Sequence, residues 1–122
     1  AAMILKIKIN ENAKTPAFWN VYPELSHNEM VGYTLPQAKF HILSFIDKND
    51  NPKNIKRIKI TANILKKYGV DTTLIEISGK SFFEKIFGMI ILGDWISYYL
   101  ALFYNQDPTP VKMVEDLKKS LK

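Results

Sequence analysis

The chain contains no cysteine, only two histidines (His27 and His41) and a single arginine. The absence of cysteine excludes disulfides, thiolate zinc sites and thiol nucleophiles, and it favours a reducing, intracellular setting. Two histidines leave little material for a metal site, and no ligand spacing supports one, so we expect neither metal nor cofactor. Basic residues number 17 and acidic residues 12, which gives a net charge of +5. This charge suits anionic ligands, sugar phosphates and nucleic acid alike.

Long apolar runs are also scarce. The most membrane-like segment, residues 82–104, has a purely apolar core at 86–92, and Asp94 follows it closely. About 20 predominantly apolar residues would be needed to span a bilayer. The apolar stretch at the start of the chain is too short for a signal peptide, and lysines follow it at once. The chain does have 122 residues, 47% of them hydrophobic, which suffices for one small domain. We expect a cytoplasmic protein with no membrane partner.

Two stretches are predicted as strands of one parallel sheet. Residues 40–46 form an apolar run of strand length, and residues 72–77 are rich in β-branched side chains. Between them, Asn51-Pro52 is typical of the start of a helix, apolar residues recur at helical spacing, and Gly69 is a plausible stop. A strand, a helix and a second strand predict a parallel pair, and hence the α/β class with a parallel sheet flanked by helices.

The rest of the chain gives less uniform signals. Residues 81–104 are helical in length and apolar nearly all round, so we expect them to be deeply buried or in an interface. Residues 111–121 form a predicted last helix, and residues 23–33 a short one. Residues 3–9 alternate in part between apolar side chains and lysines, which by period alone predicts a strand.

Several polar groups could carry chemistry. Residues 10–29 combine three carboxylates, one histidine and several amides, which could perform general acid–base catalysis or could simply cap helices and face solvent. The basic residues of 53–67 could contact nucleic acid, but a solvated helix face explains them better. The segment Ser78-Gly79-Lys80-Ser81 is similar to the end of a phosphate loop. We discount such a loop because Leu74 stands where the upstream glycine should be.

Several motifs together point to a family. They are NENAK at 10–14, PELSHNEMVG at 23–32, GDWISYYLA at 93–101, and DPTPV at 107–111 with Leu117-Lys118. In this order and approximate spacing, they resemble the archaeal and bacterial bifunctional phosphoglucose/phosphomannose isomerases of the sugar isomerase (SIS) superfamily. Members of that family carry two SIS-type halves, and the resemblance covers only the second. It implies an SIS-like, flavodoxin-like half-domain over residues 1–122, without the N-terminal phosphate-binding SIS domain.

The resemblance also implies a reaction. Glucose 6-phosphate or mannose 6-phosphate would be isomerised to fructose 6-phosphate through a cis-enediolate. Glu11 matches the catalytic base, and His27 matches the ring-opening acid/base that is contributed to a neighbouring subunit's site. Lys118 is the choice for the family's substrate-contacting lysine, with Lys112 as the alternative. Thr109 would bind substrate nearby.

The resemblance also implies partners, and it implies a different structure for residues 3–9. A hexose 6-phosphate, a second copy of the chain or an N-terminal SIS half are the expected partners, and the chain alone should be nearly inactive. Residues 3–9 should end a helix rather than form a strand. The alternative function is a non-catalytic sugar-phosphate-binding or dimerisation module, and nucleic-acid binding is the least favoured.

Overall fold

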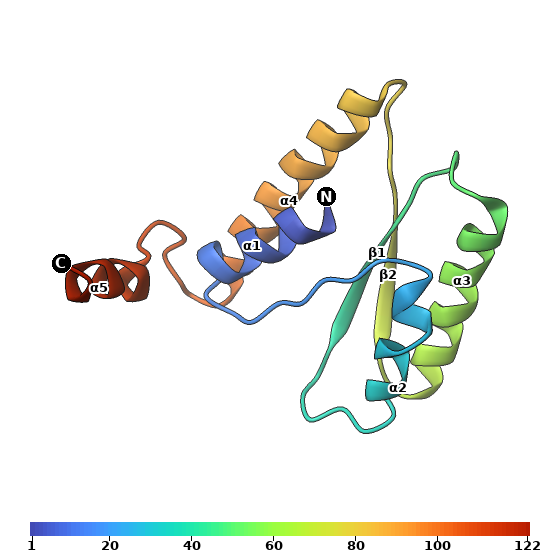
Figure 1. Ribbon diagram of the computed structural model, residues 1–122, viewed down its shortest axis with the longest axis horizontal. Coiled ribbons are helices and arrows are strands. Elements are labelled where there is room, and N and C mark those ends of the chain that lie inside the picture. Colours follow the sequence, from blue (N-terminus) through green and yellow to red (C-terminus); the bar gives the residue numbers. More distant parts are fainter. The chain divides into compact units, whose positions relative to one another are not determined.

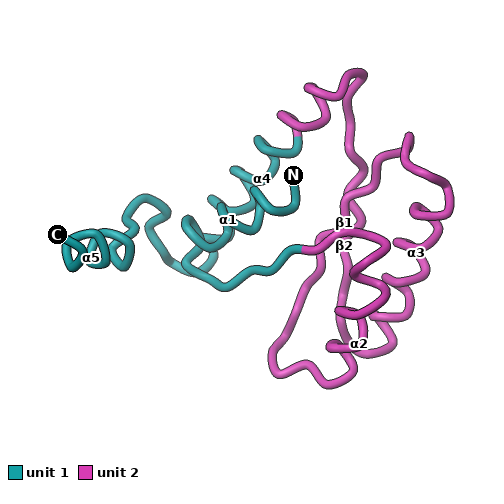
Figure 2. Tube along the Cα trace, viewed as in Figure 1, with its two compact units in different colours: residues 1–19, 89–122 teal, residues 20–88 magenta.

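The computed structural model describes all 122 residues and divides them into two compact units. The sheet unit comprises residues 20–88, and the helical unit comprises residues 1–19 and 89–122 (Figure 2). Each unit has its own buried residues, so each is described by itself.

The sheet unit contains two parallel strands joined by a helix. Strand β1 (His41–Ile46) pairs with strand β2 (Asp71–Glu76), with His41 opposite Asp71 and Ile46 opposite Glu76. Helix α3 (Pro52–Lys67) connects them and packs against both strands (Figure 1). The predicted strands, the intervening helix and the parallel pairing are confirmed, and with them the α/β class.

Helix α3 begins and ends where its sequence specifies. The Asn51 side chain accepts a hydrogen bond from the Lys53 N–H at 2.9 Å, and a proline at the first helical position needs no such partner. At the other end Gly69 has φ +78°, and the Val70 N–H donates to the Leu65 carbonyl at 3.1 Å. This hydrogen bond is typical of a Schellman motif, in which a glycine just after the helix adopts a left-handed conformation.

The segment before β1 forms two short helical turns instead of one helix over 23–33. A 3-10 turn covers Glu24–Ser26, and helix α2 covers Glu29–Gly32. Asn28 separates them, because its backbone (φ −122°, ψ −55°) departs from helical values. His27 therefore lies in the link between two turns rather than inside a helix.

The helical unit shows that residues 3–9 are not a strand. Helix α1 (Ala2–Asn12) includes them, so the expectation from the family resemblance is confirmed and the prediction from alternation is wrong. The reason is packing: Leu5 is buried, and a Cβ added at Gly93 would lie 3.4 Å from its Cδ1 atom. Burial against a distant helix outweighs a weak local period.

Helix α4 (Phe82–Phe103) begins in the sheet unit and ends in the helical unit, and helix α5 (Lys112–Ser120) follows it. The sequence predicted that α4 is either deeply buried or in an interface. The prediction of deep burial within the chain is wrong. Only Met89, Gly93, Ser97 and Ala101 are buried, whereas large side chains such as Phe83 and Tyr99 are exposed. By length and composition α4 could cross a membrane, but the core helix of a soluble protein passes the same test.

Candidate functional site

The end of helix α1 is held against α4 by two polar contacts. The Asn12 Nδ2 atom donates to the Ser97 Oγ atom at 2.9 Å, and Ser97 is completely buried. One turn earlier, the Lys8 ammonium pairs with the Asp94 carboxylate on α4. These contacts fix the helix end that carries Glu11.

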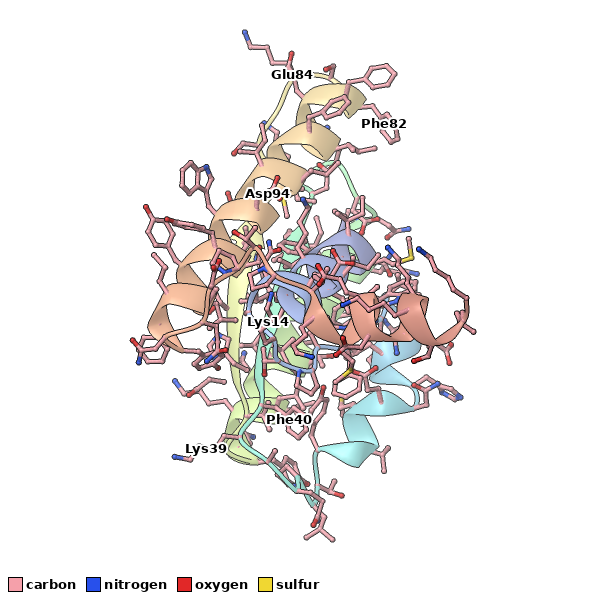
Figure 3. The ribbon with its side chains drawn as sticks, turned by 90° about the vertical axis from the view of Figure 1, so that its left-hand side faces the viewer. Lys14, Lys39, Phe40, Phe82, Glu84 and Asp94 are labelled. Atoms are coloured by element: carbon pink, nitrogen blue, oxygen red, sulfur yellow. The ribbon has the colours of Figure 1, made fainter.

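Lys14 follows this helix end (Figure 3). Its side chain ties a second segment to the helix end. Its backbone has φ +56°, and its ammonium donates to the carbonyl oxygens of Glu11 and of Pro108, the latter at 3.2 Å. The structure therefore brings the turn before α5 to the end of α1. Thr109 follows Pro108 on this turn, so Lys14 links the backbone at one predicted site residue, Glu11, to the backbone next to another, Thr109.

The Glu11 carboxylate is exposed and makes no hydrogen bond or ion pair within the chain. Its backbone carbonyl, in contrast, is engaged by Lys14. A carboxylate on a fixed backbone that is free of competing partners can accept a proton from a bound molecule.

Asp107 organises the turn that carries Thr109. The Thr109 N–H donates to the Asp107 Oδ1 atom at 2.8 Å. Hydrogen bonds from Thr109 hold the pKa of the Asp107 carboxyl below its usual range, and the charge of Lys14 adds to this effect. Asp107 is thus a structural anion of the turn, while the Thr109 side chain is exposed.

The two candidate lysines on helix α5 differ in their partners. Lys112 forms an ion pair with Asp116 one turn later. Lys118 is exposed and makes no ion pair within the chain. Lys118 is therefore the freer cation of the two.

His27 belongs to the sheet unit, so the structure describes it apart from Glu11 and Thr109. Its side chain is exposed, and its N–H closes the 3-10 turn onto the Glu24 carbonyl at 2.9 Å. The preceding Ser26 hydroxyl donates to the Pro23 carbonyl at 2.7 Å and lies 3.3 Å from the Arg57 guanidinium, which donates to it. His27 thus projects from a turn in which its own backbone N–H and the side chain of the preceding Ser26 are both hydrogen bonded.

A half-buried carboxylate, that of Glu29, lies close to His27 in sequence. Glu29 accepts hydrogen bonds from Asn20 Nδ2 at 2.8 Å and from the Tyr33 hydroxyl at 3.1 Å. Burial raises the pKa of Tyr33 to about 12, and the negative charge of Glu29 contributes to the shift. These contacts explain Glu29 as a structural anchor of α2 rather than as an acid–base group.

Sequence reasoning missed the residues that position Glu11. It quoted Asn12, Lys14 and Ser97 as members of motifs but gave them no role. A serine in a predicted helix that is apolar nearly all round was the available signal, because a polar group that becomes buried there needs a partner. No group of three His, Asp or Glu side chains is placed to hold a metal ion.

Comparison with known proteins agrees with this α/β domain. The family model described as "Bacterial phospho-glucose isomerase C-terminal SIS domain" matches residues 1–121. The chain is similar to the bifunctional phosphoglucose/phosphomannose isomerases of Aquifex aeolicus (38% identical over 119 residues, 96% of this chain) and Caldicellulosiruptor bescii (40% over 119 residues, 95%). It is also 29% identical over 116 residues, 93% of this chain, to a D-glucosamine-6-phosphate 4-epimerase of Sulfolobus acidocaldarius. No solved structure matches.

The fold and the match together define an SIS domain of the α/β class. The chain belongs to the family of bacterial phospho-glucose isomerase C-terminal SIS domains. It spans 37%, 35% and 34% of the length of these three relatives, in the same order.

Proposed function

We propose that this chain is the catalytic C-terminal SIS domain of an aldose–ketose isomerase acting on hexose 6-phosphates. The observation that supports this proposal most directly is the unpaired Glu11 carboxylate, which lies on a helix end that Asn12 and Lys14 fix. In the proposed reaction Glu11 removes the proton from C2 of the open-chain aldose. The protonated Glu11 returns this proton to C1 of the resulting cis-enediolate while the hydroxyl proton on O2 moves to O1, which gives the ketose.

The remaining site residues take complementary roles. His27 moves the proton that opens the sugar ring, in the site of a neighbouring subunit. Lys118 contacts the substrate, and its lack of an ion pair favours it over Lys112. Thr109 binds substrate from the turn that Lys14 ties to α1.

The proposal includes a partner and a location. The relatives are nearly three times as long as the matched segment, so we infer that a further SIS half supplies the phosphate-binding groups. The exposed apolar side chains of α4 provide a surface for that half or for a second copy. The reaction is one of cytoplasmic sugar-phosphate metabolism, and the chain by itself should turn over little substrate.

A chimera tests the proposal directly. This chain replaces the matching segment of the Aquifex aeolicus relative, and turnover and exchange of the C2 proton with solvent are measured. Glu11→Gln keeps the shape of the side chain but removes the base, so exchange should fall roughly 10² to 10⁴-fold, the usual contribution of a positioned acid–base group. His27→Gln should instead slow ring opening, and an open-chain substrate should recover part of the rate.

Two substitutions serve as matched controls. Glu115→Gln changes another exposed carboxylate, and His41→Gln changes the other histidine, which is hydrogen bonded to Thr73. Both should leave exchange unchanged. Wild-type exchange in Glu11→Gln would show that Glu11 is not the base. An inactive but folded parent chimera that still binds hexose phosphate would favour the alternative, a non-catalytic binding or dimerisation module.

A further inference from the structure

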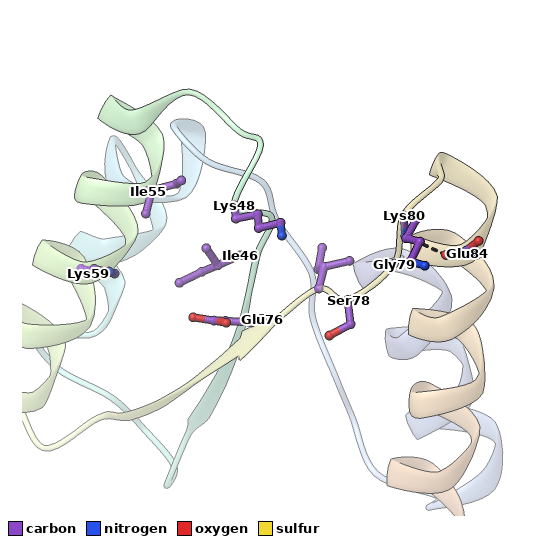
Figure 4. A pocket seen from close by; sticks show the side chains of 10 residues that line it. Ile46, Lys48, Ile55, Lys59, Glu76, Ser78, Gly79, Lys80 and Glu84 are labelled. Atoms are coloured by element: carbon purple, nitrogen blue, oxygen red, sulfur yellow. Dashed lines mark hydrogen bonds between the residues drawn. The ribbon is translucent and has the colours of Figure 1, made fainter.

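An open hollow of about 600 Å³ lies at the carboxyl ends of β1 and β2, entirely within the sheet unit (Figure 4). Ile46 and Glu76, the last residues of the two strands, line it. In α/β proteins ligands bind outside the carboxyl ends of parallel strands, and this volume is within the usual range of small-molecule sites. None of the residues proposed for isomerisation lines this hollow.

Three lysines from three different segments surround the hollow. Lys48 follows β1, Lys59 belongs to α3, and Lys80 precedes α4 (Figure 4). None of their ammonium groups forms an ion pair within the chain, whereas the neighbouring Lys85 binds both carboxylate oxygens of Asp47, at 2.8 and 2.7 Å. The three cations are therefore available to an anion from outside.

The loops that carry Lys48 and Lys80 are fixed rather than loose. The contact between Lys85 and Asp47 joins the loop after β1 to the first turn of α4. The Ile77 N–H donates to the Ile46 carbonyl at 2.8 Å, which continues the pairing of the strands into the loop. At Gly79, with φ +141°, an added Cβ would lie 2.9 Å from the backbone nitrogen of Lys85, so only glycine fits this turn.

Two carboxylates also face the hollow. Glu84 accepts a hydrogen bond from the Lys80 N–H at 2.7 Å, so it is already engaged at the start of α4 (Figure 4). Glu76 makes no hydrogen bond or ion pair through its side chain. Three cations against two anions leave an excess of positive charge around the hollow.

We propose that this hollow binds inorganic phosphate or a small phosphate monoester through the ammonium group of Lys48 and the hydroxyl of Ser78, in the positive field of Lys59 and Lys80, which flank the hollow on opposite sides (Figure 4). The sequence here lacks the glycine pattern of a phosphate loop, so the anion is held by side chains rather than by a ring of backbone N–H groups. The site lies outside the proposed isomerisation machinery and does not depend on it.

The experiment is an NMR titration of the ¹⁵N-labelled chain at constant ionic strength, with inorganic phosphate in one arm and glycerol 3-phosphate in the other. Saturable shifts should be confined to the amides of residues 46–48 and 76–81. Exposed ion pairs are individually weak, so we expect a Kd on the order of 1 to 10 mM. Tighter binding of glycerol 3-phosphate would identify the monoester as the better ligand, and equal binding would identify inorganic phosphate as sufficient.

Charge variants of the exposed side chains decide the assignment. Lys59→Gln and Lys80→Gln should each weaken binding roughly 2- to 5-fold, and Glu76→Gln should strengthen it by a similar factor. Lys66→Gln, on the same helix as Lys59 but away from the hollow, should change nothing. Equal weakening by Lys66→Gln, unsaturable shifts across all lysine-rich segments or no shift at all would each overturn the proposal. None of these titrations measures turnover. Their outcome therefore does not depend on whether the chimera isomerises hexose phosphates.

Discussion

The hydrogen bond between Asn12 and Ser97 provides the most direct test of how Glu11 is positioned. The Ser97 hydroxyl accepts from Asn12 at 2.9 Å and donates to the Asp94 carbonyl at 3.0 Å, and the side chain is completely buried. Ser97→Ala removes one neutral hydrogen bond, worth about 1 kcal/mol, and leaves a half-buried amide donor without its partner, at a cost of up to about 1 kcal/mol. Alanine has a higher helix propensity than serine, which offsets about 0.5 kcal/mol of this loss in the free energy of unfolding.

The net loss in the free energy of unfolding should be about 1 kcal/mol, which lowers Tm by roughly 3 to 5 °C in a chain of this size. Urea and thermal unfolding of Ser97→Ala, Asn12→Ala and the double variant form the assay. The two residues should show a coupling energy of about 1 kcal/mol, because either change alone already breaks the bond. Ser120→Ala is the matched control, since this serine also donates to a helix carbonyl, of Asp116, but has no side-chain partner.

Strictly additive losses, within about 0.3 kcal/mol, would refute this reasoning. They would mean that the bond contributes nothing to the native state. The end of α1 would then lack the anchor on which the role of Glu11 depends.

Two further predictions concern Tyr33 and the surface of α4. Because the pKa of Tyr33 is raised to about 12, the folded state holds this proton more tightly than the unfolded chain, so the corresponding stability is complete below pH 10 and is lost as the pH rises through about 12. Absorbance titration should show a late tyrosinate step that shrinks in Tyr33→Phe. The exposed apolar face of α4 should cause self-association of the chain, and a strict monomer in sedimentation at tens of micromolar, where a modest interface should hold, would contradict this.

Local signals predicted the sheet unit well because its elements are determined locally. Asn51-Pro52 starts α3 with a side-chain cap, and Gly69 ends it in a conformation that glycine adopts at no steric cost. The β-branched residues around 72–77 favour a strand, and residues 71–76 form one. Such elements need no information from distant parts of the chain.

Residues 3–9 illustrate where local reasoning fails. Their alternation reflects Lys6 and Lys8 between apolar residues, yet Lys8 pairs with Asp94, which is 86 positions away. Leu5 packs against Gly93. Neither contact can be read from the period of the segment, and both favour a helix. The family resemblance gave the correct structure because it carries information on distant contacts.

The residues that we propose as reactive were named from the sequence, but the residues that support them were not. Glu11 and His27 stand out through the family resemblance, and their roles stay predictions. Lys14 does not stand out, because its role depends on a positive φ and on the carbonyl of Pro108, which lies 94 positions further along the chain. Supporting contacts of this kind are defined by tertiary structure, so the sequence shows them only as unexplained members of a motif.

Helix α4 shows why hydrophobicity alone did not predict its environment. Its buried residues, Met89, Gly93, Ser97 and Ala101, recur every four positions and form one stripe along the helix. Three of them are small, which lets α1 approach closely, whereas the large side chains lie outside the stripe and remain exposed. Residue size, rather than residue polarity, therefore marks the face that packs within the chain. The large apolar residues that this packing leaves uncovered are the ones for which we propose a partner outside it.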